Sequence, residues 1–111
     1  MTAPIIETVT DNAAWAGATP RLSVLIPTFR DDPTALLRAL DGAKAEGSAE
    51  IVVLDDGGGD EALAARISKI VSGLKRPARF VRLSRNAGRA QGRNRLAAHA
   101  RGRHLLFLDS D

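Results

Sequence analysis

Short apolar runs alternate with segments of helical periodicity along most of the chain. The runs at 21–28, 50–56 and 103–109 are almost wholly apolar until they reach a polar end. Continuous apolar runs of this length are typical of strands buried on both faces of a parallel sheet. The run at 78–84 alternates apolar and polar positions and predicts a further strand.

A segment of helical periodicity follows each of the runs at 21–28, 50–56 and 78–84. Asp32 and Pro33 form a start signal before apolar positions that are spaced as on one face of a helix up to Ala43. Asp60 is placed to cap a second helix that ends near Gly73, and a third extends from about residue 87 to 100. This alternation predicts an α/β fold, a Rossmann-like parallel sheet with helices on both faces.

The chain has 111 residues, enough for one domain. Residues 1–20 show no clear period and end in Ala-Thr-Pro, so we expect a flexible N-terminal lead-in with Trp15 as a packing anchor. The domain proper is expected at residues 21–111.

The polar ends of the four predicted strands are the first candidate for a site. Ligands of such sheets bind at the carboxyl ends of the strands, where helix N-termini add partial positive charge. The polar ends are Pro27 to Arg30, Asp55 to Gly57, Ser84 to Asn86, and Asp109 to Asp111.

Composition removes several classes of protein. Cysteine is absent, which excludes disulfides and thiolate metal sites. No apolar run reaches the roughly 20 residues of a transmembrane helix, and the N-terminus lacks the pattern of a secretion signal. We therefore expect a cytoplasmic protein without a membrane segment, with any membrane association left to parts outside this sequence.

Charge is unevenly distributed, although the net charge is only +3. Residues 1–61 hold 11 of the 13 acids, whereas residues 62–108 hold 12 basic residues and no acid. Such a basic half suits either a solvated surface or a polyanion partner, such as nucleic acid or a nucleotide diphosphate. Composition leaves both interpretations open.

The glycine-rich turn at 57–62 matches a dinucleotide fingerprint only formally. Asp55, Asp56, Asp60 and Glu61 would surround a pyrophosphate with negative charge, and the ribose-binding acid expected about 20 residues later is missing. A dehydrogenase is therefore disfavoured.

Neighbouring side chains of a strand point to opposite faces, so one of Asp55 and Asp56 should brace the turn while the other faces the ligand edge. The alternative is that both cap the turn.

Asp109 and Asp111 share a face because they are two positions apart. Their Cα atoms would lie roughly 6–7 Å apart in a strand. One carboxylate can then reach a hard cation, Mg²⁺ or Mn²⁺, and the other a ribose hydroxyl.

Arg89 and Arg93 lie one turn apart on the third helix, so both can approach a diphosphate from its N-terminal end. Gly88 and Gly92 would let this helix pack closely on the sheet. Other basic side chains of this stretch are expected to face solvent or to be structural: Arg95, Arg101, Arg103, His99 and His104.

Four motifs in order, VLIPTFR, EIVVLDDGGGD, NAGRAQGRNRLAAHARG and HLLFLDSD, resemble the inverting family 2 glycosyltransferases of GT-A fold. The resemblance covers residues 22–111. It implies a nucleotide-sugar site with Pro27, Thr28 and Arg30 around base and ribose. It also implies Asp56 at the base edge, Arg93 at the base or diphosphate, Asp111 on the metal and Asp109 on the ribose or metal.

Two positions depart from the family pattern, which usually has Asn at position 30 and Ser at position 58. Here they are Arg30 and Gly58. Arg30 would add a cation to the site, and Gly58 would remove a hydroxyl that braces the turn.

The resemblance implies a donor half of an enzyme that transfers a sugar from a nucleoside diphosphate, most simply a UDP-sugar, to a hydroxyl of an unidentified acceptor. The family's catalytic base lies in a second half, so we expect the 111-residue chain, truncated after the Asp-x-Asp motif, to be inactive alone. The alternatives are a nucleic-acid-binding module and a nucleotidyltransferase fragment. The first is disfavoured because the chain has three phenylalanines and no tyrosine, too few for a stacking surface.

Overall fold

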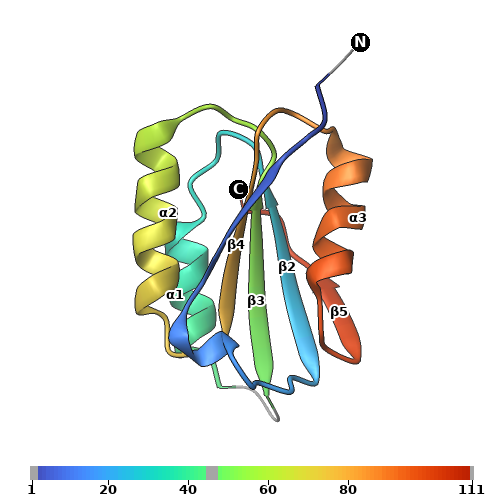
Figure 1. The fold of residues 1–111 in the computed structure, drawn as a ribbon. Helices are drawn as coiled ribbons and strands as arrows, with labels where there is room; N and C mark the ends of the chain where they lie inside the picture. Colours follow the sequence, from blue (N-terminus) through green and yellow to red (C-terminus); the bar gives the residue numbers. More distant parts are fainter. Residues whose placement is uncertain (1–2, 45–47, 111) are drawn as a thin grey trace.

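The computed structural model describes residues 3–44 and 48–110 as a single sheet covered by helices (Figure 1). The sheet has the strand order β1-β4-β3-β2-β5. Its strands are β1 (Glu7–Asp11), β2 (Leu22–Thr28), β3 (Ala49–Asp55), β4 (Ala78–Leu83) and β5 (His104–Phe107). The helices are η1 (Ala13–Trp15), α1 (Thr34–Gly42), α2 (Glu61–Gly73) and α3 (Arg89–His99).

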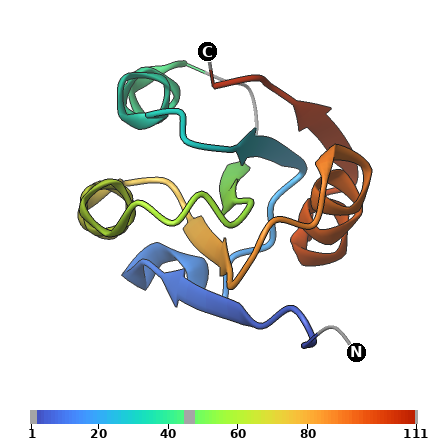
Figure 2. The same cartoon turned by 90° about the horizontal axis from the view of Figure 1, so that it is seen from above.

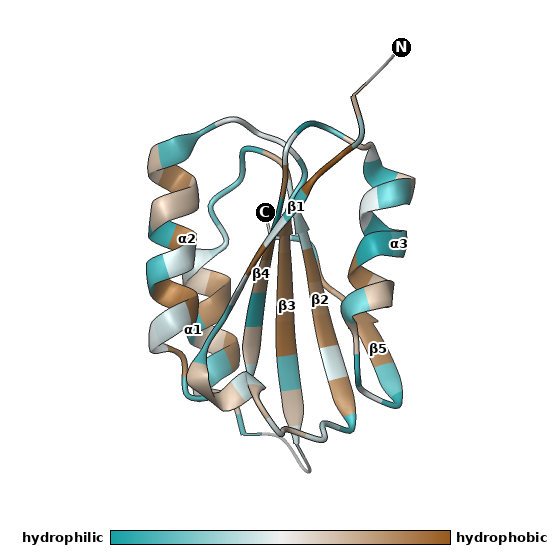
Figure 3. Cartoon of the chain, viewed as in Figure 1, coloured by the Kyte–Doolittle hydropathy of each residue, from teal (hydrophilic) through white to brown (hydrophobic). Residues whose placement is uncertain are grey.

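The predicted Rossmann-like architecture is confirmed. Strands β2 to β5 are mutually parallel, with β3 and β5 on either side of β2. Helices α1 and α2 cover one face and α3 covers the other, as the view along the strands shows (Figure 2). Each face therefore encloses its own apolar core, and β2 and β3 are the most apolar strands of the sheet (Figure 3).

The N-terminal segment corrects the expectation of a flexible lead-in. Residues 7–11 form strand β1, which pairs antiparallel with β4. Asn12 then caps the short helix η1 and accepts a hydrogen bond from the backbone N–H of Ala78. Trp15 is buried, as expected of a packing anchor. The sequence concealed β1 because its partly polar run, ETVTD, has an exposed outer face.

Strand β5 is found where a strand was predicted, but it is not buried on both faces. It forms the edge of the sheet, and Leu105 and Leu106 are 46% and 44% exposed. Neighbouring residues of a strand point to opposite faces, so the exposure of both leucines shows that neither face of β5 is fully covered. Apolar composition alone had indicated an interior strand.

The uneven charge distribution is partly balanced by ion pairs. Five arginines of the basic half form ion pairs with acids of the first half: Arg66–Asp32, Arg79–Asp11, Arg82–Glu61, Arg95–Glu7 and Arg101–Glu50. Much of the positive charge thus ties distant segments together and does not form an unpaired basic face. Arg95 and Arg101 are therefore not simply exposed to solvent, as the sequence had suggested.

Glu7 is the acid that joins β1 to α3. It accepts hydrogen bonds from Arg95 (2.8 Å) and contacts the Nε2 of His99 (2.8 Å). Burial by itself raises the pKa of Glu7, but the hydrogen bonds from Arg95 and His99 outweigh it, so that the pKa is lowered. The charged form of Glu7 is thus favoured in the folded chain.

Among the described residues, no helix is both long and apolar enough to cross a membrane.

Candidate functional site

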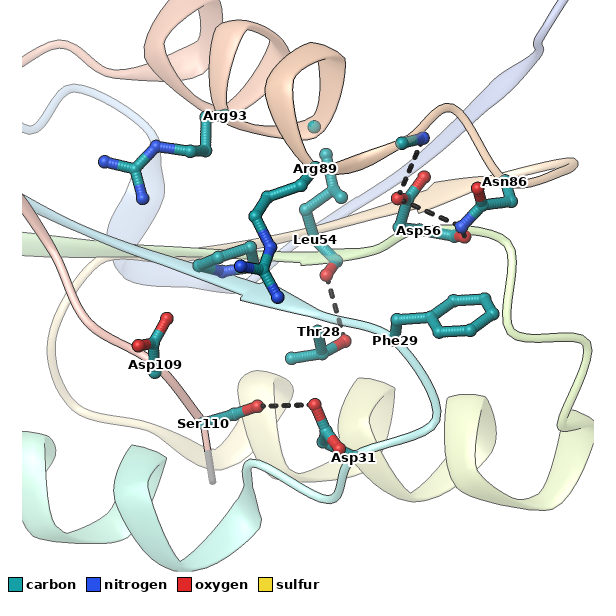
Figure 4. A pocket seen from close by; sticks show the side chains of 13 residues that line it. Thr28, Phe29, Asp31, Leu54, Asp56, Asn86, Arg89, Arg93, Asp109 and Ser110 are labelled. Carbon is teal, nitrogen blue, oxygen red and sulfur yellow. Dashed lines mark hydrogen bonds between the residues drawn. The ribbon is translucent and has the colours of Figure 1, made fainter.

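A cleft of about 460 Å³ lies at the edge of the sheet where the parallel strands end (Figure 4). The ends of β2, β3 and β5, the loop before α3 and the first turns of α3 surround it. It is lined by Pro27, Thr28, Phe29, Asp31, Leu54, Asp56, Asn86, Gly88, Arg89, Gly92, Arg93, Asp109 and Ser110. The polar strand ends therefore converge as the sequence predicted.

The side chains of Asp55 and Asp56 point to different sides of β3, as expected of neighbouring residues in a strand. Asp55 accepts a hydrogen bond from the backbone N–H of Gly58 and lies near Arg82, so it braces the turn after β3. Asp56 points to the other side and borders the cleft. Both carboxylates are buried.

Asp56 also organises the loop that leads into α3. Its carboxylate accepts hydrogen bonds from the backbone N–H groups of Ala87 (2.7 Å) and Gly88 (3.2 Å) and from the Asn86 side chain (3.2 Å). Gly88 adopts φ 93°, a left-handed conformation that suits glycine. Asp56 thus fixes the cleft wall from which Arg89 projects.

Arg89 and Arg93 both line the cleft from α3. Figure 4 shows the Arg89 side chain reaching from the helix into the cleft, whereas the Arg93 side chain extends to the side, away from Arg89. Neither arginine forms an ion pair with a described residue; Arg93 stacks over the ring of Phe107 at 4.1 Å. A Cβ at Gly92 would lie 3.7 Å from the Leu54 side chain, an ordinary van der Waals distance, and a Cβ at Gly88 would meet no atom within 4 Å. Neither glycine is therefore needed for close helix–sheet packing, contrary to the prediction from the sequence.

Carboxylates face these arginines from the other side of the cleft. Asp109 follows β5, and Asp31 follows β2. Ser110 donates a hydrogen bond to Asp31 (3.3 Å). Asp111 lies outside the described residues. Oxygen atoms are the ligands that Mg²⁺ and Mn²⁺ prefer, and the three described side chains supply only oxygens, so the donor set fits such a cation.

The described residues contain no cluster of three or more metal-ligating side chains. A cation here would therefore take few protein ligands and complete its coordination with phosphate oxygens and water, as Mg²⁺ commonly does.

The sequence pattern of glycosyl transferase family 2 matches residues 23–111, which is most of the chain. The chain belongs to glycosyl transferase family 2. Three curated proteins named N-acetylglucosaminyltransferase are similar to it. One from Bradyrhizobium diazoefficiens is 26% identical over 97% of this chain and 23% of its own length. One from Bradyrhizobium sp. strain ANU 289 is 28% identical over 85% of this chain and 63% of its own length.

The third, from Bradyrhizobium elkanii, is 26% identical over 83% of this chain and 52% of its own length. The chain therefore spans between about a quarter and two thirds of the length of these family 2 relatives.

Arg30 is the one described member of the predicted site set that does not line the cleft. Its backbone adopts φ 63°, the left-handed region, and its guanidinium stacks over the ring of Phe29 at 4.9 Å. Asn tolerates this conformation better than Arg does, so the Asn that the family resemblance led us to expect at this position would carry less strain.

The two departures from the family pattern touch each other. A Cβ at Gly58 would lie 3.2 Å from the backbone N of Arg30 and 3.3 Å from its Cγ. The missing side chain at Gly58 therefore leaves room for the longer side chain of Arg30.

Replacing Arg30 with Gly is expected to leave the free energy of unfolding unchanged or to raise it by up to about 0.5 kcal/mol. Glycine relieves the left-handed strain, but the lost stacking on Phe29 and the greater freedom of the unfolded chain offset part of the gain. The matched change Arg38→Gly, within helix α1, is expected to cost about 1 kcal/mol. Urea unfolding measures the free energy of unfolding of both variants. A decrease of about 1 kcal/mol or more in Arg30→Gly would show that the left-handed backbone of Arg30 is not strained.

The sequence predicted most of the polar lining, and its candidate strand ends also contain Phe29, Asn86 and Ser110, although it assigned these three no contact with a ligand. It gave no binding role to Asp31, Leu54, Gly88 and Gly92. Asp31 directly follows Arg30, and its place in the same strand-end loop was the available signal. Phe29 is 41% exposed, which is unusual for a phenylalanine.

Proposed function

We propose that the chain binds a nucleoside diphosphate sugar in this cleft together with Mg²⁺ or Mn²⁺, as the donor-binding part of a family 2 glycosyltransferase. The observation that carries the proposal is the juxtaposition, in a family 2 chain, of Arg89 and Arg93 with Asp109 at the carboxyl edge of a parallel sheet. Cationic and anionic side chains on opposite walls suit a diphosphate bridged by a divalent cation.

The base and ribose are assigned to the part of the cleft near β2 and β3. Phe29 offers an exposed ring for stacking, and Pro27 and Thr28 lie beside it. The Thr28 hydroxyl donates to the carbonyl of Leu54, which leaves its oxygen lone pairs to accept from a ligand. Asp56 would accept a hydrogen bond from an N–H at the edge of the base.

The diphosphate is assigned to the arginine side of the cleft. Arg89 and Arg93 would donate hydrogen bonds to its oxygens, while Asp109 and Asp111 would hold the cation. When bound, the cation would neutralise charge on the departing diphosphate.

The relatives' printed names make N-acetylglucosamine the first sugar to test, carried by UDP. Transfer to an acceptor hydroxyl requires a base that we do not assign to any residue of this chain, so we expect the 111-residue chain to bind donor without transferring it. The nucleic-acid alternative draws less support, because five of the twelve basic residues in 62–108 form ion pairs with acids of this chain and are less available to phosphates.

Calorimetric titration of UDP into the purified chain, with and without Mn²⁺, tests the proposal after circular dichroism has confirmed folding. We expect binding that requires Mn²⁺ and is lost in Asp109→Asn. Asp60→Asn is the matched control, because Asp60 caps α2 away from the cleft and Asn caps equally well. A folded chain that binds none of UDP, GDP or dTDP would refute the proposal.

A further inference from the structure

Two loops that are distant in sequence meet at the acidic side of the cleft. Asp31 follows β2, Ser110 follows β5, and the Ser110 hydroxyl donates a hydrogen bond to the Asp31 carboxylate (3.3 Å). Both side chains line the cleft, and Figure 4 shows them pointing toward each other. No described interaction other than this hydrogen bond joins the side chains of these two loops.

Asp31 differs in its surroundings from its neighbour Asp32. Asp32, two residues before α1, accepts a hydrogen bond from the backbone N–H of Thr34, and it forms an ion pair with Arg66. The hydrogen bond from Thr34 is the main cause of its lowered pKa. Asp31 forms no ion pair with any residue in the described ranges, and its carboxylate faces the cleft. The hydrogen bond from Thr34 and the ion pair with Arg66 therefore account for Asp32 but leave Asp31 without a structural role elsewhere.

Ser110 lies between Asp109 and Asp111. In extended chain, successive side chains point to opposite sides, so fixing the direction of Ser110 also fixes that of Asp109. Figure 4 shows this arrangement: Ser110 points toward Asp31, whereas Asp109 points away from it. Just upstream, the backbone N–H of Leu108 donates to the carbonyl of Leu25 (3.0 Å), which anchors the segment to β2. Beyond that bond, the Ser110 hydroxyl holds the segment.

We propose that Asp31 is a positioning residue: by holding Ser110, it orients the Asp109 carboxylate toward the arginine wall of the cleft. The inference rests on the proposed function in that the oriented carboxylate serves the divalent cation. Asp31 acts through its oxygen as a hydrogen-bond acceptor and not through its charge as a cation ligand.

Substitutions separate these two roles, because Asn keeps an acceptor oxygen and loses the charge. Asp31→Ala and Ser110→Ala are each expected to weaken Mn²⁺-dependent UDP binding roughly three- to tenfold, the typical net contribution of one hydrogen bond. The double variant should be no weaker than either single variant. Asp31→Asn should stay within about twofold of the unchanged chain. Asp32→Ala is the matched control and should not change affinity.

The opposite pattern overturns the inference. If Asp31→Asn weakens binding as much as Asp31→Ala while Ser110→Ala has no effect, Asp31 acts through its charge and not through Ser110. Additive losses in the double variant would also contradict a shared hydrogen bond.

A second measurement is independent of nucleotide. Backbone order parameters from nitrogen-15 relaxation of the ligand-free chain should fall at Asp109 and Ser110 in Asp31→Ala and Ser110→Ala, but not in Asp31→Asn. If the chain binds no UDP yet the order parameters fall, the proposed function fails, but the tether, meaning the hydrogen bond by which Asp31 holds Ser110, is supported. Unchanged order parameters in all variants would refute the tether whether or not UDP binds.

Discussion

Replacing Arg93 with Ala is expected to weaken UDP binding in the presence of Mn²⁺ by roughly 10- to 100-fold. A hydrogen bond between charged partners contributes about 1.5–3 kcal/mol, and each 1.4 kcal/mol is tenfold in affinity. The side chain lines the cleft from α3 and has no described ion pair, so its guanidinium is available to an anion. Calorimetric titration gives the dissociation constants.

Two companions locate the effect. Arg93→Lys retains the charge but not the planar fork, so it should recover part of the lost affinity. Arg103→Ala removes one charge just before β5, at the end of the strands opposite to the cleft, and should leave the affinity for UDP unchanged. Equal losses at positions 93 and 103 would show that net charge, and not the cleft, governs binding.

Replacing Glu50 with Ala is expected to lower the free energy of unfolding by about 3–5 kcal/mol, the typical cost of leaving the partner of a buried ion pair uncompensated. Glu50 is fully buried in β3. Its carboxylate accepts from the Ser23 hydroxyl (2.7 Å), from the backbone N–H of Arg101 (2.7 Å) and from the Arg101 guanidinium (2.8 Å). Loss of Glu50 therefore leaves three donors without their acceptor. Urea unfolding followed by circular dichroism measures the change.

Glu50→Gln keeps one acceptor oxygen, so we expect a smaller loss, about 1–3 kcal/mol. The contrasting control is Glu61→Ala, because Glu61 pairs with Arg82 at the surface and its loss should have little effect. A change below 1 kcal/mol in Glu50→Ala would mean that the buried cluster does not hold the turn before β5 against β2 and β3.

The architecture followed from local pattern. Continuous apolar runs in 21–28 and 50–56 indicated strands covered on both faces. The helix-start signal at Asp60 was correct, because Asp60 caps α2. The signal at Asp32 was one residue early: Pro33 holds the N-cap position of α1, and Asp32 accepts a hydrogen bond from the backbone N–H of Thr34. Parallel pairing then forced the polar strand ends to one edge. The convergence of Asp56, Arg93 and Asp109 on one cleft was therefore predictable without tertiary information.

What failed depended on partners distant in sequence. Strand β1 is stabilised by pairing with β4, some 70 residues later, which no local period reveals. Arg101 looked like a solvent-exposed charge until Glu50 and the Trp15 ring were placed beside it. The left-handed backbone of Arg30 likewise could not be inferred, because arginine rarely adopts it.

Paramagnetic broadening by Mn²⁺ tests the central claim most directly. Mn²⁺ added in substoichiometric amounts to the UDP complex of the nitrogen-15-labelled chain should selectively broaden the backbone amide signals of Asp109, Ser110 and Asp31. The amide signals of residues near Glu50, at the opposite end of the strands, should stay sharp. Broadening that is uniform, or centred away from the strand ends, would contradict a metal-assisted nucleotide site in this cleft.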